Sequence, residues 1–370
     1  MVFFIVPVVL YIILIFFIPI IWLILGSNFN ESDNKIKQLT LVIPFRNEEG
    51  NLYKLFESIN GLKTGVELNY IFINDHSEDN GPAMVKEWIN QQEGRAIYLD
   101  LPNDLIGKKS ALNYGIDHVK TDWIWQLDAD VSFKSNILDL FEYTVDSNTK
   151  LILAPVVLKG NIKAYKNQFQ IFENTVLQFI TSISAKLNSA FLANGANLFY
   201  SKKVFIAYKN DCIGDKFASG DDLFLLNFVK NKYGSNSVFY LNHPQSAVST
   251  NVILDKLSFW NQKIRWASKM KNSYLKVPII INLFFAVLFL ISLLFFVFLF
   301  LIPLKIWLAF LLLKIIVEIF AFIIILNFFK VRANLILFPW FVFTYSFYML
   351  KVFFFSKNNS FEWKIRIHNQ

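Results

Sequence analysis

Long stretches without a charged residue constrain this chain more than any other feature. Val2 to Leu25 is the first, and about 20 apolar residues are enough to cross the hydrocarbon core of a bilayer as a helix. A cleaved signal peptide is the alternative. It is disfavoured because the stretch lacks a basic start, exceeds the usual apolar length and precedes no obvious small-x-small cleavage site. We therefore predict a retained N-terminal anchor.

Three more apolar stretches lie near the C-terminus. They run from Val277 to Ile302, from Ile306 to Phe329 and from Leu335 to Phe355, separated by a break at Pro303 and a basic break at 330–332. With the first stretch they account for a chain that is 55% hydrophobic and only 17% charged, against about 25% charged residues in an ordinary soluble domain. We predict one N-terminal and about three C-terminal transmembrane helices.

The orientation follows from basic residues just before the second apolar stretch, which are Lys256, Lys263, Arg265, Lys269, Lys271 and Lys276. Lys and Arg are enriched on the cytoplasmic side of membrane proteins, so these residues place the preceding polar region in the cytoplasm. Three terminal crossings would then put the tail outside. That tail is itself basic, with Lys357, Lys364 and Arg366. The count therefore stays open, and a re-entrant or interfacial terminal segment is the alternative.

The polar region from about Lys37 to Lys276 is long enough to bury a core of its own. The only cysteine, Cys212, excludes an internal disulfide framework and favours a reducing compartment. The net charge of +8 suits an anionic membrane face or a phosphate-bearing ligand without choosing between them. Function is therefore expected in this region.

Apolar runs in the polar region alternate with amphipathic helical patterns. The runs that read as strands are Thr40–Phe45, Leu68–Asn74, Ala96–Asp100 and Trp123–Leu127. This alternation predicts βαβ units and a mostly parallel sheet in an α/β fold. Ligands bind beyond the carboxyl ends of such strands. Polar clusters fall at three of these ends, at residues 44–49, 74–77 and 128–130.

Two carboxylates two residues apart, Asp128 and Asp130, follow the apolar run Trp123–Leu127. Side chains two apart point to the same side of an extended chain. Mg²⁺ is commonly held by one or two carboxylates while substrate phosphates complete its shell, which predicts a site for a diphosphate ligand. A solvated acidic turn is the alternative for an isolated pair. The position after a strand favours the metal site.

Two further acidic residues, Asp221 and Asp222, precede a helical pattern. An Asp at this position caps a helix well. The same carboxylate, held beside a cleft, could accept a hydroxyl proton as a general base. Capping and catalysis are compatible, so Asp222 is a candidate base.

Gln262, Arg265 and Trp266 share one face of a predicted helix just before the second apolar stretch. Arg and Trp near a membrane are usually interfacial anchors, but Gln has no such role. Lys108 precedes another helix as either a phosphate contact or a solvated charge. Inside the third apolar stretch, an ion pair between Lys314 and Glu318 is expected to be structural. The four histidines show no metal-ligand spacing and are expected to be structural.

Taken together and in this order, these motifs resemble the family 2 glycosyltransferases of GT-A fold, a group that includes cellulose, chitin and poly-N-acetylglucosamine synthases and ceramide glucosyltransferase. The resemblance covers roughly Leu39 to Met270; its single motifs are weak, but their ordered set is specific. The domains it implies are an anchor at 1–26, a GT-A catalytic domain at 37–250, an interfacial helix at 251–276, transmembrane helices at 277–356 and a basic tail at 357–370.

The resemblance also implies roles for single residues. Asp128 and Asp130 match a D-x-D pair that binds Mg²⁺ or Mn²⁺ and the donor diphosphate, and Asp222 stands where the family has its base. Asn194–Asn197 resembles a segment beside the acceptor. Asn74 replaces the first Asp of a base-contacting motif, so only Asp75 carries over. The donor-binding residues it implies are Pro44, Arg46, Glu48, Asp75, Lys108, Asp128, Gln262, Arg265 and Trp266.

The implied activity is that of an inverting hexosyltransferase using a nucleotide-sugar, with a lean toward UDP. The metal would neutralise the leaving diphosphate while Asp222 removes a proton from the attacking hydroxyl. Alignment of the two reactants would supply much of the acceleration. A nucleotidyltransferase is disfavoured because no Gly-rich triphosphate loop is present.

The acceptor is predicted to be a lipid or a lipid-linked glycan, because anchors at both ends hold the site near the bilayer. Residues Asn161 to Leu192, with apolar side chains at helical spacing, are expected to rest on the interface. A small processive polysaccharide synthase with a partner subunit is the alternative, and an inactive membrane scaffold ranks below it. We predict an integral protein of the bacterial inner membrane with a cytoplasmic catalytic domain that binds no nucleic acid.

Overall fold

The computed structural model describes residues 2–26, 36–139, 141, 148–211, 220–270, 302–355, 361–363 and 366–368. Nearly all of the predicted span Val277–Ile302 lies outside these residues, as does Cys212. The side chains that carry the predicted site all lie within them.

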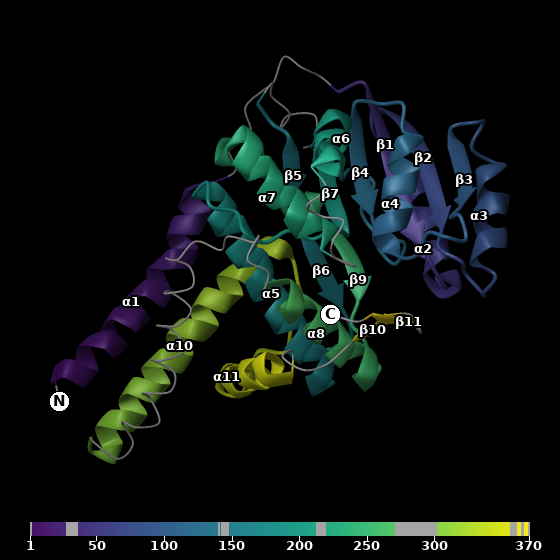
Figure 1. The fold of residues 1–370 in the computed structure, drawn as a ribbon. Helices are drawn as coiled ribbons and strands as arrows, with labels where there is room; N and C mark the ends of the chain where they lie inside the picture. The colour runs from purple at the N-terminus through teal and green to yellow at the C-terminus, as the bar shows by residue number, and fades with distance from the viewer. Residues whose placement is uncertain are drawn as a thin grey trace.

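A seven-stranded sheet forms the centre of the polar region (Figure 1). Its strands are β1 Gln38–Phe45, β2 Glu67–Asn74, β3 Ala96–Asp100, β4 Trp123–Leu127, β5 Leu151–Leu153, β7 Asn197–Ser201 and β8 Val238–Tyr240. Their order is β3-β2-β1-β4-β7-β5-β8, and only β7 runs antiparallel to its neighbours. The predicted mostly parallel α/β sheet is confirmed, and the four predicted strands begin within two residues of the observed ones.

The carboxyl ends of β1, β2, β3 and β4 meet at one edge because these strands are parallel. Phe45 pairs with Asn74, and Asn74 with Asp100, so three strand ends lie side by side. Residues 46–48, 75–77 and 128–130 follow directly along this edge. The polar clusters that the sequence scattered over 85 positions are therefore neighbours in the fold.

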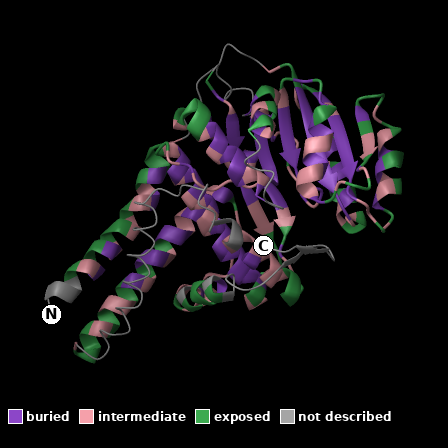
Figure 2. Ribbon diagram, viewed as in Figure 1, coloured by how far each residue is buried: buried purple, intermediate pink, exposed green. Residues whose placement is uncertain are grey.

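Helices cover both faces of the sheet. They are α2 Glu49–Asn60 and α3 Gly81–Ile89 on one face, and α4 Lys108–Asp117, α6 Lys202–Asn210 and α7 Asp221–Tyr233 on the other. Alternate residues of each strand enter the two cores, as the two-residue repeat of a strand requires. Leu41 and Phe72 pack under α2 and α3, whereas Val42 and Ile73 pack under α4. Figure 2 shows the sheet buried between these layers.

A smaller parallel sheet pairs β6 Val156–Lys159 with β9 Val248–Asn251, next to the long helix α5 Tyr165–Lys186. Most of α5 is buried, including polar residues along its length. The expectation that Asn161 to Leu192 rests on a lipid interface is wrong for this helix. It packs against β6, β8 and the apolar helices, and the polar side chains of Gln170 and Asn174 bond to backbone carbonyls.

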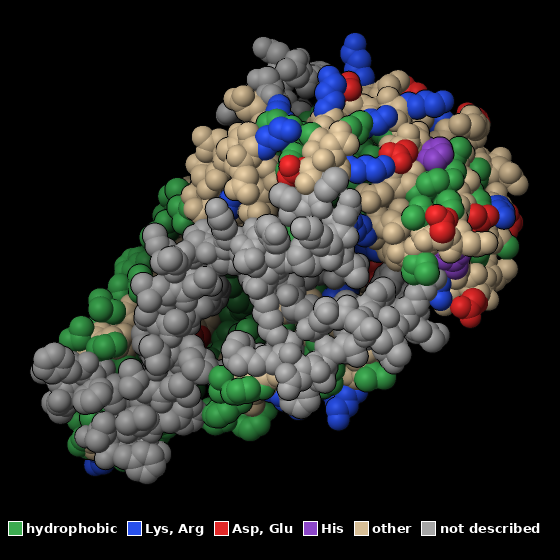
Figure 3. Space-filling view, in the orientation of Figure 1, with side chains coloured by type: hydrophobic (Ala, Val, Ile, Leu, Met, Phe, Trp, Pro, Cys, Tyr) green, Lys and Arg blue, Asp and Glu red, His purple; other side chains and the backbone are tan. Residues whose placement is uncertain are grey.

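Three apolar helices of the described part of the chain lie beside this body: α1 Val2–Ile24, α10 Leu304–Phe329 and α11 Phe338–Phe355. Among the described residues, two helices are long and apolar enough to cross a membrane, Val6–Ile24 and Leu304–Phe329. Figure 3 shows hydrophobic side chains along their outer surface, while charged side chains gather over the sheet. The predicted count of four is therefore only partly supported.

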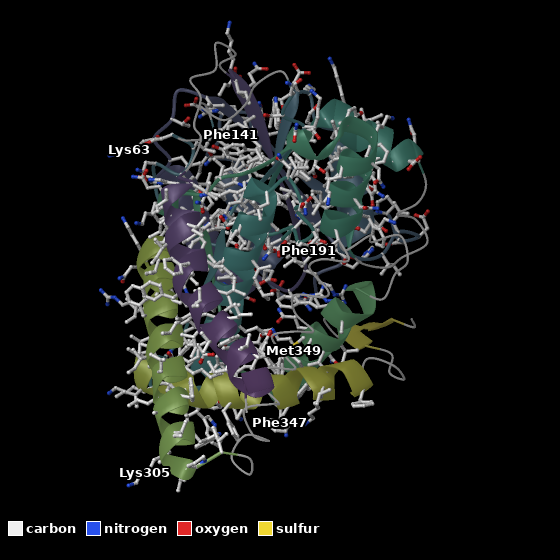
Figure 4. The ribbon with its side chains drawn as sticks, turned by 90° about the vertical axis from the view of Figure 1, so that its left-hand side faces the viewer. Lys63, Phe141, Phe191, Lys305, Phe347 and Met349 are labelled. Carbon is white, nitrogen blue, oxygen red and sulfur yellow. The ribbon has the colours of Figure 1, made fainter. Side chains whose placement is uncertain are left out.

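The helices α1 and α10 lie side by side and run in the same direction. Val8 packs near Ile302 and Trp307 at one end, and Trp22 packs against Phe329 at the other. Lys305 marks the end of α10 farthest from the sheet (Figure 4). Both helices therefore run toward the sheet.

Polar contacts also join α1 to α10. The Lys314 Nζ to Glu318 Oε1 distance is 2.5 Å with both side chains buried, and the Tyr11 hydroxyl donates to Glu318. The predicted ion pair is confirmed. It connects the two apolar helices, since Tyr11 belongs to α1 and both charged residues belong to α10.

The helix α11 crosses the direction of α1 and α10 instead of running beside them (Figure 4). A short turn at Leu335–Leu337 precedes it, and its outer side exposes Trp340, Phe347 and Phe354 by 56%, 52% and 63%. Its inner side packs against α5 and against α8 Lys256–Met270. The chain closes with a hairpin of β10 Phe361–Trp363 and β11 Arg366–His368, and β10 contacts α8.

Candidate active site

Residues after β1 connect the first two strand ends. Arg46 is buried, and its guanidinium donates to the carbonyl oxygens of Asp75 and His76, both at 2.9 Å. The side chain of Glu48 accepts from Asn51 at 2.7 Å, and Pro44 lies within β1. Arg46 therefore holds the first two strand ends together, a role the sequence did not indicate, whereas Glu48 bonds to the first turn of α2.

The turn after β2 is fixed by its own polar side chains. Asn74 donates to Asp100 at 2.9 Å and accepts from the Ser77 backbone at 2.9 Å. Asp75 is 1% exposed, and its Oδ1 accepts from the Gly107 backbone at 3.2 Å. Gly107 has a φ of +92°, a conformation that favours glycine. Asp75 thus positions the start of α4 and with it Lys108.

Lys108 and Asp128 form an ion pair at the end of β4. Their side chains are 26% and 35% exposed. The close approach of Gly195 completes this corner: a Cβ added there would lie 2.7 Å from Gln126 Nε2 and 3.6 Å from Lys108 Nζ. Only a glycine allows the 194–196 turn to approach so closely.

Asp222 lies in the first turn of helix α7 and faces the 194–196 turn. Its Oδ2 accepts from the Gly195 backbone at 3.2 Å, and its Oδ1 accepts from the Leu223 backbone at 2.9 Å. An added Cβ at Gly195 would lie 3.6 Å from the Asp222 Cβ. Asp222 is therefore both a helix-terminal acceptor and a neighbour of the Lys108–Asp128 pair.

Asp130 lies two residues beyond Asp128 and has a different partner. Its Oδ2 accepts from the Thr250 hydroxyl of β9 at 2.8 Å. No group of three or more His, Cys, Asp or Glu side chains suited to a metal gathers in the described part of the chain. Two carboxylates after one strand suit a hard cation only if a ligand such as a diphosphate supplies further oxygens.

The helix α8 brings Arg265 to this group from the other side. Burial lowers the pKa of Arg265, and the charge of Asp128 acts in the opposite direction. Asp222 and Asp221 also act on Arg265. Arg265 therefore lies within electrostatic reach of carboxylates from two other elements.

Lys108 belongs to the same electrostatic group. Burial alone would lower the pKa of Lys108, but the charge of Asp128 and the hydrogen bond to it raise the value above its usual range. Asp222 and Asp221 add to this effect. The two cations and the three carboxylates therefore lie within electrostatic reach of one another near the carboxyl edge of the sheet, an arrangement that suits an anionic ligand.

Gln262 and Trp266 are the other two residues of the predicted α8 motif. Both are partly exposed, and the Lys263 ammonium lies 4.3 Å from the centre of the Trp266 ring. Lys263 and Arg265 had been counted as charges at the membrane boundary. Lys263 is instead 6% exposed and paired with Glu173, so it is a protein contact.

Gln126 and its partner Tyr200 also belong to this region but were not singled out from the sequence. Gln126 donates to the Gly195 carbonyl and accepts from Tyr200, each at 2.9 Å. Asn197, in a segment expected beside the acceptor, is fully buried and bonds to Trp125 and to backbone carbonyls. A Gln inside the apolar run Trp123–Leu127 was the available signal.

Comparison with known proteins identifies the class. Residues 40–208 match the model of the family described as glycosyl transferase family 2. This part of the chain is a family 2 glycosyltransferase domain. The match ends before α7 and α8, so it includes Asp128 but not Asp222 or Arg265.

One curated relative is the poly(ribitol-phosphate) β-N-acetylglucosaminyltransferase TarP of Staphylococcus aureus (strain N315). It is 24% identical over 198 residues, which make up 53% of this chain and 58% of the relative. The match thus spans little more than half the length of that relative. A solved structure with the same fold is the mannosyltransferase PcManGT from Pyrobaculum calidifontis in complex with GDP-Man and Mn²⁺, at 12% identity, a TM-score of 0.54 and 96% coverage of each chain. This likeness is consistent with the predicted GT-A fold.

Proposed function

We propose that the protein transfers a hexose from a nucleotide-sugar to an acceptor hydroxyl at a membrane surface, with inversion at the anomeric carbon. The observation that carries the proposal is the charge cluster at the carboxyl edge of β4. Lys108, Asp128, Asp222 and Arg265 come to it from four separate elements. Family 2 membership supports sugar transfer as the chemistry.

Asp128 and Asp130 are proposed to hold Mg²⁺ or Mn²⁺ together with the donor diphosphate. Their carboxylate oxygens are suitable ligands for either ion, and the PcManGT structure of similar fold contains Mn²⁺ and GDP-Man. The bound cation would stabilise the charge of the departing nucleoside diphosphate. A UDP-sugar is the donor we propose to test first.

The chain's own groups would divide the remaining work. Lys108 and Arg265 would contact phosphate oxygens, since they carry the positive charge of the cluster. Asp222 would accept the proton of the acceptor hydroxyl, because its carboxylate lies at the turn beside Lys108. Pro44, Glu48 and Asp75 would shape the nucleoside side, and Gln262 and Trp266 the acceptor side.

A membrane position is supported by α1 and α10, which are long and apolar enough to cross a bilayer. We propose that both cross, with the sheet on the cytoplasmic side of a bacterial inner membrane, and that α11 lies in the interface. The site would then lie near lipid headgroups, which favours a lipid or lipid-linked acceptor. The domain boundaries predicted from the sequence are retained in this proposal.

A transfer assay tests this function. Full-length protein in detergent is incubated with radiolabelled UDP-glucose, UDP-N-acetylglucosamine or GDP-mannose, Mn²⁺ and a bacterial membrane extract. Label that partitions into organic solvent supports the lipid acceptor. A water-soluble ladder of products would instead favour the processive polysaccharide synthase. No transfer from any donor, with a matched preparation of Asp222→Asn as the blank, would contradict the proposal.

A further inference from the structure

A buried ion pair lies two residues from Arg265 on the opposite side of α8. Lys263 Nζ is 2.5 Å from Glu173 Oε2 of α5, and both side chains are 6% exposed. The Tyr348 hydroxyl of α11 donates to Glu173 Oε1 at 3.1 Å. Lys263 also lies over the rings of Phe259 and Trp266. Three helices therefore meet at one carboxylate.

Glu173 is held rigidly because α5 is bonded to the sheet region around it. Gln170, one turn earlier, donates to the Ile253 carbonyl at 2.9 Å and accepts from the Ile253 backbone at 3.0 Å. Asn174 donates to the Val156 carbonyl of β6 at 2.8 Å. Glu173 is therefore a fixed point against which α8 can be placed.

The geometry of a helix connects this fixed point with the charge cluster. Successive residues of an α-helix are about 100° apart, so positions two apart face about 200° from each other. Lys263 therefore faces α5 and α11, while Arg265 lies on the other side of α8, within electrostatic reach of Asp128 and Asp222. Fixing Lys263 therefore also fixes the position of Arg265 around and along the axis of α8.

Stability alone does not explain a charged pair at this position. Desolvation offsets most of the attraction in a buried pair, and an apolar pair of similar volume is often as stable. A charged hydrogen bond, however, permits one arrangement of α8, whereas apolar contacts tolerate small rotations. A misplacement of about 1 Å near a reacting group can reduce turnover about 100-fold.

We propose that Glu173, Lys263 and Tyr348 form a positioning network that sets Arg265 against the donor diphosphate. The inference rests on the proposed function and adds residues that do not touch the substrate. It also gives α11 a part in catalysis, because Tyr348 belongs to that helix. Trp260 of α8 is held there too, with the Lys351 ammonium 4.6 Å from its ring centre.

The test compares nucleotides that differ only in the phosphate that Arg265 would contact. Binding of UDP, UMP, GDP and GMP to full-length protein in detergent with Mn²⁺ is measured by calorimetry for Glu173→Gln, Lys263→Met and Arg265→Ala. Each variant should lose about tenfold or more in affinity for the bound diphosphate and stay within about twofold for its monophosphate. A merely structural defect would weaken both.

A double variant separates positioning from general damage. Because Glu173→Gln is expected to act through Arg265, adding it to Arg265→Ala should cause little further loss. Thr175→Val is the matched control: Thr175 is buried on α5, bonds to the Ile171 carbonyl of its own helix, and should bind as the unaltered protein does. Tyr348→Phe removes one hydroxyl and should lose about two- to tenfold.

The outcomes are distinguishable. If the unaltered protein binds neither diphosphate, the proposed function fails and the network's role with it. If the unaltered protein binds but Glu173→Gln and Tyr348→Phe bind equally well, the network alone is overturned. Additive losses in the double variant, or equal losses for the monophosphate, would also overturn it. If Glu173→Gln does not fold, Tyr348→Phe and Lys263→Met decide the question by the same criteria.

Discussion

Replacement of Asp222 by Asn tests the chemistry most directly. The substitution keeps the size of the side chain and removes its charge. Asp222 accepts two backbone hydrogen bonds, from Gly195 and from Leu223, one on each oxygen. Asn has a single side-chain oxygen, so one of these backbone donors loses its acceptor.

The expected loss of folding stability and the expected loss of turnover differ in size. One lost hydrogen bond costs about 0.5–1.5 kcal/mol of folding free energy. Loss of a general base lowers turnover by about 10²–10⁴-fold, which corresponds to about 2.7–5.4 kcal/mol in the activation barrier. If Asp222 is the base, the catalytic loss exceeds the loss of stability by several-fold.

The measurements are kcat and the KM for the donor, together with the midpoint of urea unfolding. We expect a fall in kcat with a nearly constant donor KM and a small shift in the midpoint. Asp221→Asn removes the same charge one residue away and should leave kcat much less affected. A variant that loses stability but keeps its turnover would show that Asp222 only stabilises the start of α7.

Three further sets of variants test the metal site, the packing of the sheet and a titrating residue. Asp128→Ala and Asp130→Ala should abolish Mn²⁺-dependent donor binding in calorimetry; binding equal to that of the unaltered protein would remove the metal assignment. Gly115→Ala should destabilise the domain by about 1–3 kcal/mol, because the new Cβ would lie 2.5 Å from Ile73 Cδ1, and Ile73→Val should restore part of this loss in urea unfolding. Burial lowers the pKa of His243, so the unfolded chain binds that proton more readily. Stability should therefore be full above about pH 6.5 and decline as pH falls through the folded pKa. His243→Asn should flatten that decline, and an unchanged slope would contradict the assignment.

The four strands were predictable because their signals are local. Each is a short apolar run closed by turn residues, and Trp123–Leu127 was located to the residue. The antiparallel insertion of β7 between β4 and β5 was not, because it depends on pairing across more than 40 positions. The sequence also placed Asp128 and Asp222 at element ends, where the structure has them. Their roles as metal ligand and base stay predictions.

The helix α5 shows where a sequence pattern leads to a wrong prediction. Its apolar side chains at helical spacing, mixed with Lys and Gln, are typical of an interfacial helix. Gln170 and Asn174 are instead satisfied by backbone groups. Hydropathy assigns the same value to a polar side chain in water and to one bonded inside a protein. Glu173 and Lys263, 90 positions apart, gave no sign of their pairing for the same reason.

The directions of the helices bear on the conflict over the basic tail. The described helices α1 and α10 both run toward the sheet. We propose that the predicted span Val277–Ile302, which lies almost wholly outside the described residues, crosses in the opposite direction between them. With α11 in the interface, this proposal requires no later crossing and predicts three crossings in all. The tail would then lie on the side of the sheet, which suits its basic residues and the contact of β10 with α8.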